Sequence, residues 1–316
     1  MSILLGPLMY QARIIATLSL WGVLLPWLAL PCIAQQLEPR RWTHLPINTN
    51  FAAGGYAYTE ADISFNPVLR IEDVNMEMHT WAAGYIRTFE LLEKSARVEL
   101  LQAWQEGRWS GMVNGVPTSI KRQGWSDTVA RFAVNLIGAP PLAGKEYTAY
   151  RAATDVETVV GAALSVQLPT GEYKKDKLIN LGSNRFTFRP QLGVVHNRGK
   201  WSFEGTGAAW IYTDNNSFFN GNLLEQNPFY TLQTHVIHTF SPGLWVGASA
   251  GYGFGGQSTV NGIEINDRKE TAVWAISGGY PITRRLSLKG SYIETRRQTS
   301  VGADSETLAI GLSTFW

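Results

Sequence analysis

The sequence predicts an all-β fold: an antiparallel transmembrane β-barrel in the bacterial outer membrane. Three observations carry this prediction. Apolar residues alternate with small or polar residues over long stretches, as in "VVGAALSVQL". Short turns and longer polar connections follow one another along the chain. The chain also ends in a strand-like stretch, "ETLAIGLSTFW", which brings two aromatic residues to the C-terminus.

The N-terminus has the three parts of a secretory signal peptide. Arg13 stands before an apolar run over residues 14–30, and "CIA" provides the small-residue exit that such peptides carry. This run is short for a membrane-spanning helix, which needs about 20 residues, and a proline interrupts it. We therefore expect residues 1–34 to be removed, rather than to remain as a membrane anchor or as a lipoprotein attached through Cys32.

The exported chain then has two parts. Residues 35–49 form a periplasmic N-terminal segment, and residues 50–316 form the barrel. Because Cys32 is the one cysteine of the sequence, the exported chain has no disulfide, no cysteine nucleophile and no cysteine ligand for zinc. The chain is 45% hydrophobic and 16% charged, which is unlike a disordered protein, and its net charge of +2 without a basic run gives no signature of nucleic-acid binding.

Twelve stretches with a period of two form the predicted wall. No stretch after the signal peptide is apolar enough for a transmembrane helix, and many of the strands exceed the usual length of about five or six residues. An even number of strands leaves both ends of the barrel on the periplasmic side, and closure leaves no unpaired edge in lipid. Barrels of ten or fourteen strands are the alternatives. The predicted strands are 51–64, 76–89, 96–112, 124–137, 156–169, 184–196, 200–213, 227–240, 243–257, 268–280, 285–298 and 303–316.

The connections alternate in character, as they do when one end of a barrel has short periplasmic turns and the other has long outer loops. "LLEKS", "HNRGKW", "FSPGLW" and "YPITRR" are tight turns. "PTGEYKKDKLINLGSN", "TDNNSFFNGNLLEQN" and "QSTVNGIEIND" are longer, polar connections. Residues 138–155 are an exception, because a short turn is expected there; residues 145–151 within them could form one or two helical turns.

Aromatic residues cluster near the strand ends, where they would form girdles at the two membrane interfaces. On this pattern Trp316 anchors the closing strand. The turn side has Trp201, Trp245, Tyr280, Phe315 and Trp316, and the loop side has Trp125, Phe186 and Tyr252.

Several stretches resemble a family of bacterial outer-membrane proteins labelled transporters of the MetA pathway of phenol degradation. They include "VNLIGAPPLAGKEYTAYRAATDVETVVGAALSVQLPTGEYKKDKLINLGSNRFTFRPQLG" and "QNPFYTLQTHVIHTFSPGLWVGASAGY", and together they cover most of residues 47–316. The resemblance implies a barrel that passes small, often aromatic, compounds, and the family's "GAP" segment accounts for the long connection at 138–155. It also implies that Phe315 and Trp316 are a signal to the outer-membrane insertion machinery, although the family often ends in a Trp- or Arg-rich strand and this chain ends "STFW".

One parity of the central strands points polar side chains into the barrel. If Phe186, Phe188 and Leu192 face the lipid, the residues between them face the lumen. These side chains would line a polar passage with aromatic contacts, or the charged ones would pair and stabilise a barrel that transports nothing. The lumen-facing candidates are Arg185, Arg189, Gln191, Glu204, Trp210, Tyr212, Gln233, His235 and Lys289.

We expect no catalytic residue, no metal site and no cofactor. His235 and His238 are three residues apart on a strand and so point to opposite faces. "GYGFGG" fits a dinucleotide-binding pattern, but a loop follows it where a helix is needed. An outer-membrane lipid hydrolase would use Ser and His on neighbouring lipid-facing strands, whereas here His238 points outward and Ser249 inward.

The expected function is passive passage of small compounds, with aromatic or hydrophobic cargo suggested by the resemblance. The expected partners are the lipid bilayer, the insertion machinery and a small-molecule solute, and not nucleic acid; the oligomeric state stays open. Small residues dominate the inner faces of 156–169, 243–257 and 303–316, which favours an open lumen. The main alternative is a structural or plugged barrel, and the lipid hydrolase is a weaker one.

Overall fold

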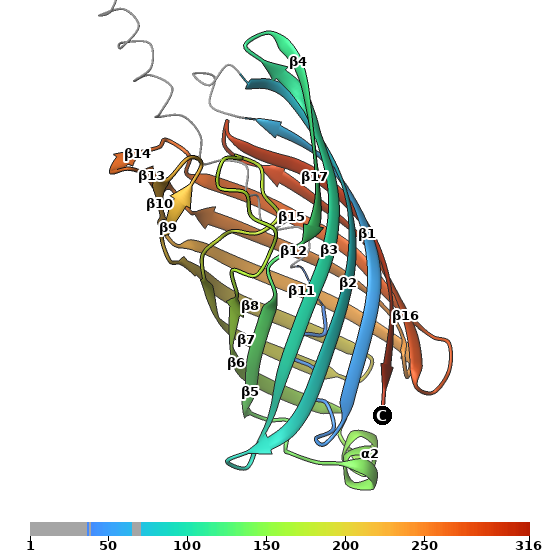
Figure 1. The fold of residues 1–316 in the computed structure, drawn as a ribbon. Helices are drawn as coiled ribbons and strands as arrows, with labels where there is room; N and C mark the ends of the chain where they lie inside the picture. The colour runs from blue at the N-terminus through green and yellow to red at the C-terminus, as the bar shows by residue number, and fades with distance from the viewer. Residues whose placement is uncertain (1–36, 38, 65–70) are drawn as a thin grey trace, which may run out of the picture.

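A computed structural model describes residues 37, 39–64 and 71–316, so the predicted signal peptide lies outside the described residues. Each wall strand pairs antiparallel with the next, and the last pairs with the first, so the described strands close into a barrel (Figure 1). The predicted antiparallel barrel of twelve strands is confirmed. The wall strands are β1 (Asn50–Ser64), β2 (Ile71–Leu91), β3 (Lys94–Val113), β5 (Val129–Ile137), β6 (Val156–Gln167), β7 (Thr187–Arg198), β8 (Trp201–Tyr212), β11 (Phe229–Ser241), β12 (Leu244–Gly255), β15 (Lys269–Pro281), β16 (Leu286–Arg297) and β17 (Gly302–Phe315).

The seam of the barrel joins the first strand to the last residues of the chain. The backbones of Asn50 and Trp316 exchange two hydrogen bonds of 3.0 Å each. The rings of Phe51 and Phe315 lie 5.8 Å apart beside them. The C-terminal aromatic residues therefore belong to the strand that closes the wall.

The wall strands bury every second residue, as the period of two predicts. Along β7 buried and exposed residues alternate without a break from Thr187 to Val195. Leu192, Leu232 and Leu308 are more than 60% exposed on the outer face, where a soluble protein would place polar groups. An outer surface of this kind matches a hydrocarbon solvent. The closed wall and its apolar face place the protein in the bacterial outer membrane, as predicted.

Replacing Leu192 with arginine is expected to destabilise the barrel through its outer face. An outward arginine costs about 2–4 kcal/mol at the bilayer midplane and only about 0–1 kcal/mol near an interface. Leu192 lies in the middle of β7, while Phe186 is outward-facing just beyond its loop end. Urea titration in lipid vesicles should therefore show a large loss in the free energy of unfolding for Leu192→Arg and a small loss for the control Phe186→Arg. Equal losses would contradict this placement of the membrane.

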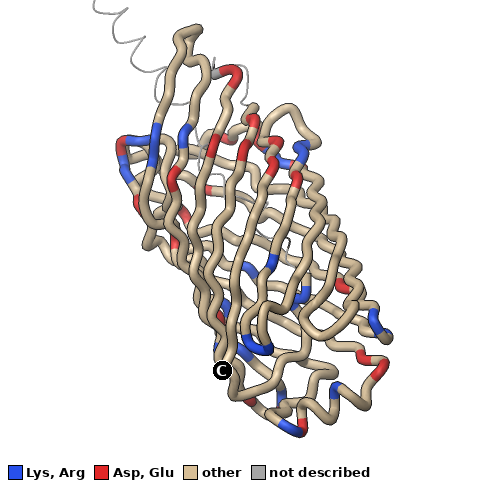
Figure 2. Tube along the Cα trace, turned by 90° about the vertical axis from the view of Figure 1, so that its right-hand side faces the viewer, with Lys and Arg blue, Asp and Glu red and all other residues tan. Residues whose placement is uncertain are grey.

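Charged residues gather toward the two ends of the barrel (Figure 2). Near the loop end, Glu77, Glu60 and Glu306 lie side by side in register on β2, β1 and β17, all exposed. Neighbouring carboxylates on a lipid-facing surface would be costly in hydrocarbon. This row therefore marks the outer boundary of the apolar band.

The end with the tight turns also carries the chain's C-terminus and the helix α2 (Gly144–Ala153) (Figure 1). The helix occupies the exceptional connection at 138–155 and is longer than the one or two turns expected there. None of the helices in the described part of the chain has the length and apolar character needed to cross a membrane.

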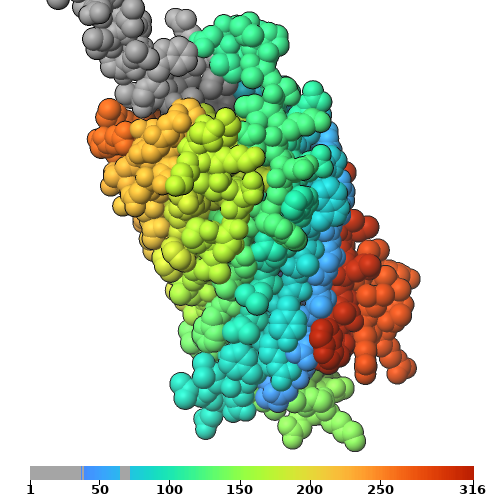
Figure 3. Space-filling view, in the orientation of Figure 1, coloured from blue at the N-terminus to red at the C-terminus, as the bar shows by residue number. Residues whose placement is uncertain are grey.

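The loop end holds strands that the sequence did not predict. β4 (Val116–Trp125) pairs with β3 in a hairpin that projects beyond the wall (Figures 1 and 3). The predicted strand 124–137 therefore divides, since β4 ends at Trp125 and the wall strand begins at Val129. The long polar connections form a second sheet of β9 (Asn215–Phe218), β10 (Asn222–Gln226), β13 (Ser258–Val260) and β14 (Ile263–Glu264).

Candidate functional site: the lumen and the segment that crosses it

The structure places the predicted lumen residues as follows. Arg189, Gln191, Glu204, Trp210 and His235 are buried, on the inward parity of their strands. Gln233 and Lys289 lie on the same parity of β11 and β16 and are half-buried, as are Arg185 and Tyr212 at the loop end. Phe315 and Trp316 are exposed at the opposite end, and their role in insertion stays a prediction.

Arginine side chains of this wall lie over aromatic rings of the neighbouring strand. The Cζ atom of Arg189 is 4.4 Å from the centroid of Trp210, and that of Arg185 is 4.4 Å from the centroid of Tyr212. Both arginines come from β7 or the residues just before it, and both rings come from β8. A cation over an aromatic face is attracted by the ring quadrupole, and more strongly when water is excluded.

An ion-pair network continues from these arginines toward the periplasmic end. Arg131 on β5 donates from Nε to Gln191 at 3.0 Å and is paired with Glu99 on β3. Arg97 is paired with the same carboxylate at 2.7 Å. Of these four residues only Gln191 was predicted from the sequence to face the lumen, although Arg131 shares the inward parity of Ala133. Arginines outnumber carboxylates on this part of the wall.

His235 forms a second polar contact inside the barrel. Its Nδ1 lies 2.7 Å from the hydroxyl oxygen of Ser249 on β12, and Glu204 on β8 is its partner in register on the other side. His238 points outward and packs its ring against Trp201 and Phe240. The Ser249–His235 pair is thus buried in the lumen. A lipid hydrolase would require such a pair to face the lipid. Among the described residues no group of three or more His, Cys, Asp or Glu could hold a metal ion.

The described residues before β1, here called the lumen segment (Leu37 and residues 39–49), lie inside the barrel. We expected residues 35–49 to lie in the periplasm. Leu37 instead packs against Val273, Ala275 and Ile293 of β15 and β16. Trp42 packs against the inner face of β5, β6 and β7 on the far side of the ring of strands. The segment therefore crosses the lumen from wall to wall.

Trp42 sits in a socket made by two inward glycines. A Cβ atom at Gly193 would lie 2.0 Å from the indole ring, and one at Gly161 would lie 2.5 Å from it, so any larger residue would displace the ring. The indole N–H donates to Thr206 Oγ1 at 2.7 Å, and the Cζ of Arg131 lies 5.3 Å from the ring centroid. The small inner residues of β6 and β7 make room for this side chain. We had inferred from the small residues of 156–169 that the lumen is open there, and Trp42 fills that space instead.

Further contacts tie the segment to other parts of the wall. The backbone N–H of Arg40 donates to Glu204 Oε2 at 2.9 Å, and its guanidinium lies 5.5 Å from the ring of Trp245. Trp245 therefore faces the lumen and does not belong to the turn-side girdle in which the sequence analysis placed it. Arg97 also donates to the carbonyl of Arg41.

The long connection at 138–155 holds the periplasmic end of the segment. His44 is buried, with Nδ1 3.2 Å from Glu157 Oε1 and Nε2 2.9 Å from the carbonyl oxygen of Pro140. Tyr147 of α2 donates to the carbonyl of His44 at 2.9 Å, and burial raises the pKa of this tyrosine, which keeps it a donor. The role of this connection, which the sequence left open, includes fixing the lumen segment.

Fold and site together define an outer-membrane β-barrel protein whose own N-terminal segment crosses its lumen. The chain belongs to the family described as "Putative MetA-pathway of phenol degradation", whose model matches residues 71–303. This confirms the family to which the sequence was found similar.

Solved structures extend the likeness of fold. The chain is similar to the COG4313 outer membrane channel from Pseudomonas putida F1, with a TM-score of 0.73 and 19% identity over 89% of this chain and 100% of that one. It is less similar to the translocator domain of the autotransporter NalP from Neisseria meningitidis (TM-score 0.48, 10% identity, 86% and 90% covered). A Pseudomonas aeruginosa FadL homologue gives a TM-score of 0.44 at 8% identity, with 85% and 90% covered. No curated protein matches the sequence.

Proposed function

We propose that the barrel lets small solutes cross the outer membrane passively, along a path that the lumen segment narrows. The observation that carries this proposal is how the segment is held. It belongs to none of the wall strands, and Leu37 and Trp42 pack it against opposite parts of the wall. A crossing element attached in this way can move without opening the strand ladder, whose closure the membrane requires.

The inner surface favours aromatic or hydrophobic solutes among small compounds. Trp42, Trp210, Tyr212 and Trp245 bring rings into the lumen, and arginines lie over all of them. Rings beside fixed polar groups bind compact solutes that have an apolar body and one polar end. The description of the family, which names phenol degradation, agrees with this class of cargo.

Single-channel recording of residues 35–316 in a planar bilayer tests the proposal. We expect discrete current steps that a small aromatic solute, such as phenol, reduces from either side. A barrel that is folded by heat-modifiability on gels and stays electrically silent would instead favour the plugged barrel. Current steps that phenol leaves unchanged would keep the channel and reject the aromatic cargo.

A further inference from the structure

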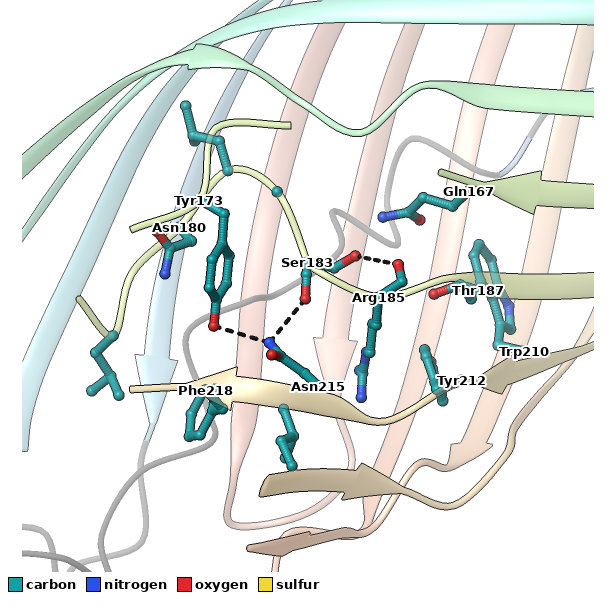
Figure 4. A pocket seen from close by; sticks show the side chains of 14 residues that line it. Gln167, Tyr173, Asn180, Ser183, Arg185, Thr187, Trp210, Tyr212, Asn215 and Phe218 are labelled. Atoms are coloured by element: carbon teal, nitrogen blue, oxygen red, sulfur yellow. Dashed lines mark hydrogen bonds between the residues drawn. The ribbon is translucent and has the colours of Figure 1, made fainter. Parts of the chain in front are cut away.

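A cavity of about 80 Å³ lies at the loop end of the barrel, apart from the lumen segment. Its walls come from the β6–β7 connection, from the loop ends of β7 and β8, and from the outer sheet of β9 and β10 (Figure 4). A single water needs about 10–15 Å³ measured in this way, so the space admits a compact solute larger than water.

Two buried hydrogen-bond donors of this cavity have no acceptor among the described residues. They are the Nη1 group of Arg185 and the indole N–H of Trp210. A buried donor without a partner costs about 1–3 kcal/mol, and a charged one costs more. Both groups would be satisfied by the oxygen atoms of a bound anion.

The carboxylates of Asp214 and Asp127 both act on Arg185 through their charge, and Asp127 is already committed to other donors. Asp127 accepts hydrogen bonds from the backbone of Gly171 and Ser183, from the Ser183 hydroxyl and from Gln167. Arg185 itself donates to Gln226 and forms no ion pair within the described residues. Burial lowers the pKa of Arg185, and the neighbouring tyrosines and carboxylates offset this effect only in part.

Aromatic and aliphatic side chains line the cavity beside the polar residues Gln167, Asn180, Ser183, Thr187 and Asn215. Tyr212 lies under the Arg185 guanidinium, with Tyr173 and Phe218 nearby, and Leu178 and Leu224 contribute methyl groups. Asn215 fixes the position of Tyr173 by donating to its hydroxyl oxygen at 2.9 Å (Figure 4). The cavity thus combines a cation that lacks an anion with a surface that suits a flat apolar body.

We propose that this cavity binds small aromatic carboxylates, with the carboxylate on Arg185 and Trp210 and the ring among Tyr173, Tyr212 and Phe218. The inference deepens the proposed function, because it assigns one class of solute to a site at the outer entrance. The arginines at 185, 189 and 131 then continue from this entrance along the inner wall toward Trp42.

Calorimetric titration of the full exported chain in detergent tests the site with four probes. Benzoate has both the ring and the charge, benzyl alcohol lacks the charge, acetate lacks the ring, and cyclohexanecarboxylate lacks the aromatic face. We expect benzoate to bind most tightly and Arg185→Gln to weaken it about tenfold or more, as for a lost charged hydrogen bond. Arg185→Lys should retain part of the affinity, and Arg284→Gln, on an exposed turn at the other end, should retain all of it.

The proposal is overturned if benzyl alcohol or acetate binds as well as benzoate, or if Arg185→Gln binds benzoate unchanged while its barrel remains folded on heat-modifiability gels. Binding with no current steps would keep this site and reject the proposed function. Current steps without benzoate binding would keep the proposed function and reject this site.

Discussion

Deletion of residues 37–48 is expected to raise the single-channel conductance of the barrel several-fold. The lumen segment spans the space between β15–β16 and β6–β7, so its removal clears the cross-section through which ions pass. The wall strands do not depend on it for their pairing, and the deletion variant should therefore still fold and insert. Recording in planar bilayers at a fixed salt concentration measures the effect.

Two point variants separate the anchor from the rest of the segment. Trp42→Ala removes a buried indole, and substitutions of this kind cost about 3–5 kcal/mol. Gly193→Val keeps the tryptophan at position 42 but displaces its ring, since even a Cβ atom at position 193 would lie 2.0 Å from that ring. Both should give frequent openings, whereas Trp201→Ala, on the lipid-facing side, should behave like the full chain. Unchanged conductance in the deletion variant would show that the segment does not limit the path.

Neutralising Arg189 is expected to lower the preference of the pore for anions. Arg189 is buried on the inner wall in the same register row as Arg131, two strands away, and the Glu99 carboxylate of that network is shared by two arginines. Reversal potentials in a salt gradient should therefore shift toward cations for Arg189→Gln and toward anions for Glu204→Gln. Arg198→Gln, exposed at a periplasmic turn, is the matched control.

The same variants distinguish a pore-lining charge from a structural one. Loss of the Arg189–Trp210 contact should lower the stability of the barrel by about 1–2 kcal/mol in either case. If the urea midpoint falls while the reversal potential stays the same, Arg189 stabilises the barrel wall and does not act on passing ions. That outcome favours the alternative in which the inner charges stabilise a barrel without transport.

The sequence predicted the wall because its signal is repeated in every strand. Outward residues such as Leu192 and Leu308 must be apolar and their neighbours must be small or polar, so the period of two survives in each strand. The hairpin of β3 and β4 escaped prediction because it leaves the membrane, where alternation is no longer enforced. Its turn signal, Asn114–Gly115 with φ of 52° and 76°, was present in the sequence.

The inner surface was only partly predictable. Parity alone places Arg189, Gln191 and Glu204, since each lies on a strand whose outer face is plainly apolar. The lumen segment has no periodicity, and the position of Trp42 depends on Gly161 and Gly193, which lie more than 100 residues away. Gly161 is one of the small residues of 156–169 that favoured an open lumen in the sequence. The sequence does not show whether the space beside a glycine stays empty or is filled by a ring from elsewhere in the chain.

Uptake of a small aromatic solute into proteoliposomes tests whether the barrel passes such solutes passively. The vesicles would carry residues 35–316 at a known number of barrels, with no energy source and an outward-to-inward gradient of labelled benzoate. We expect benzoate to enter these vesicles faster than protein-free vesicles, at a rate proportional to the number of barrels, and faster again after deletion of residues 37–48. Entry at the protein-free rate for both the full and the deleted chain, with both barrels folded, would contradict a role in passive transport.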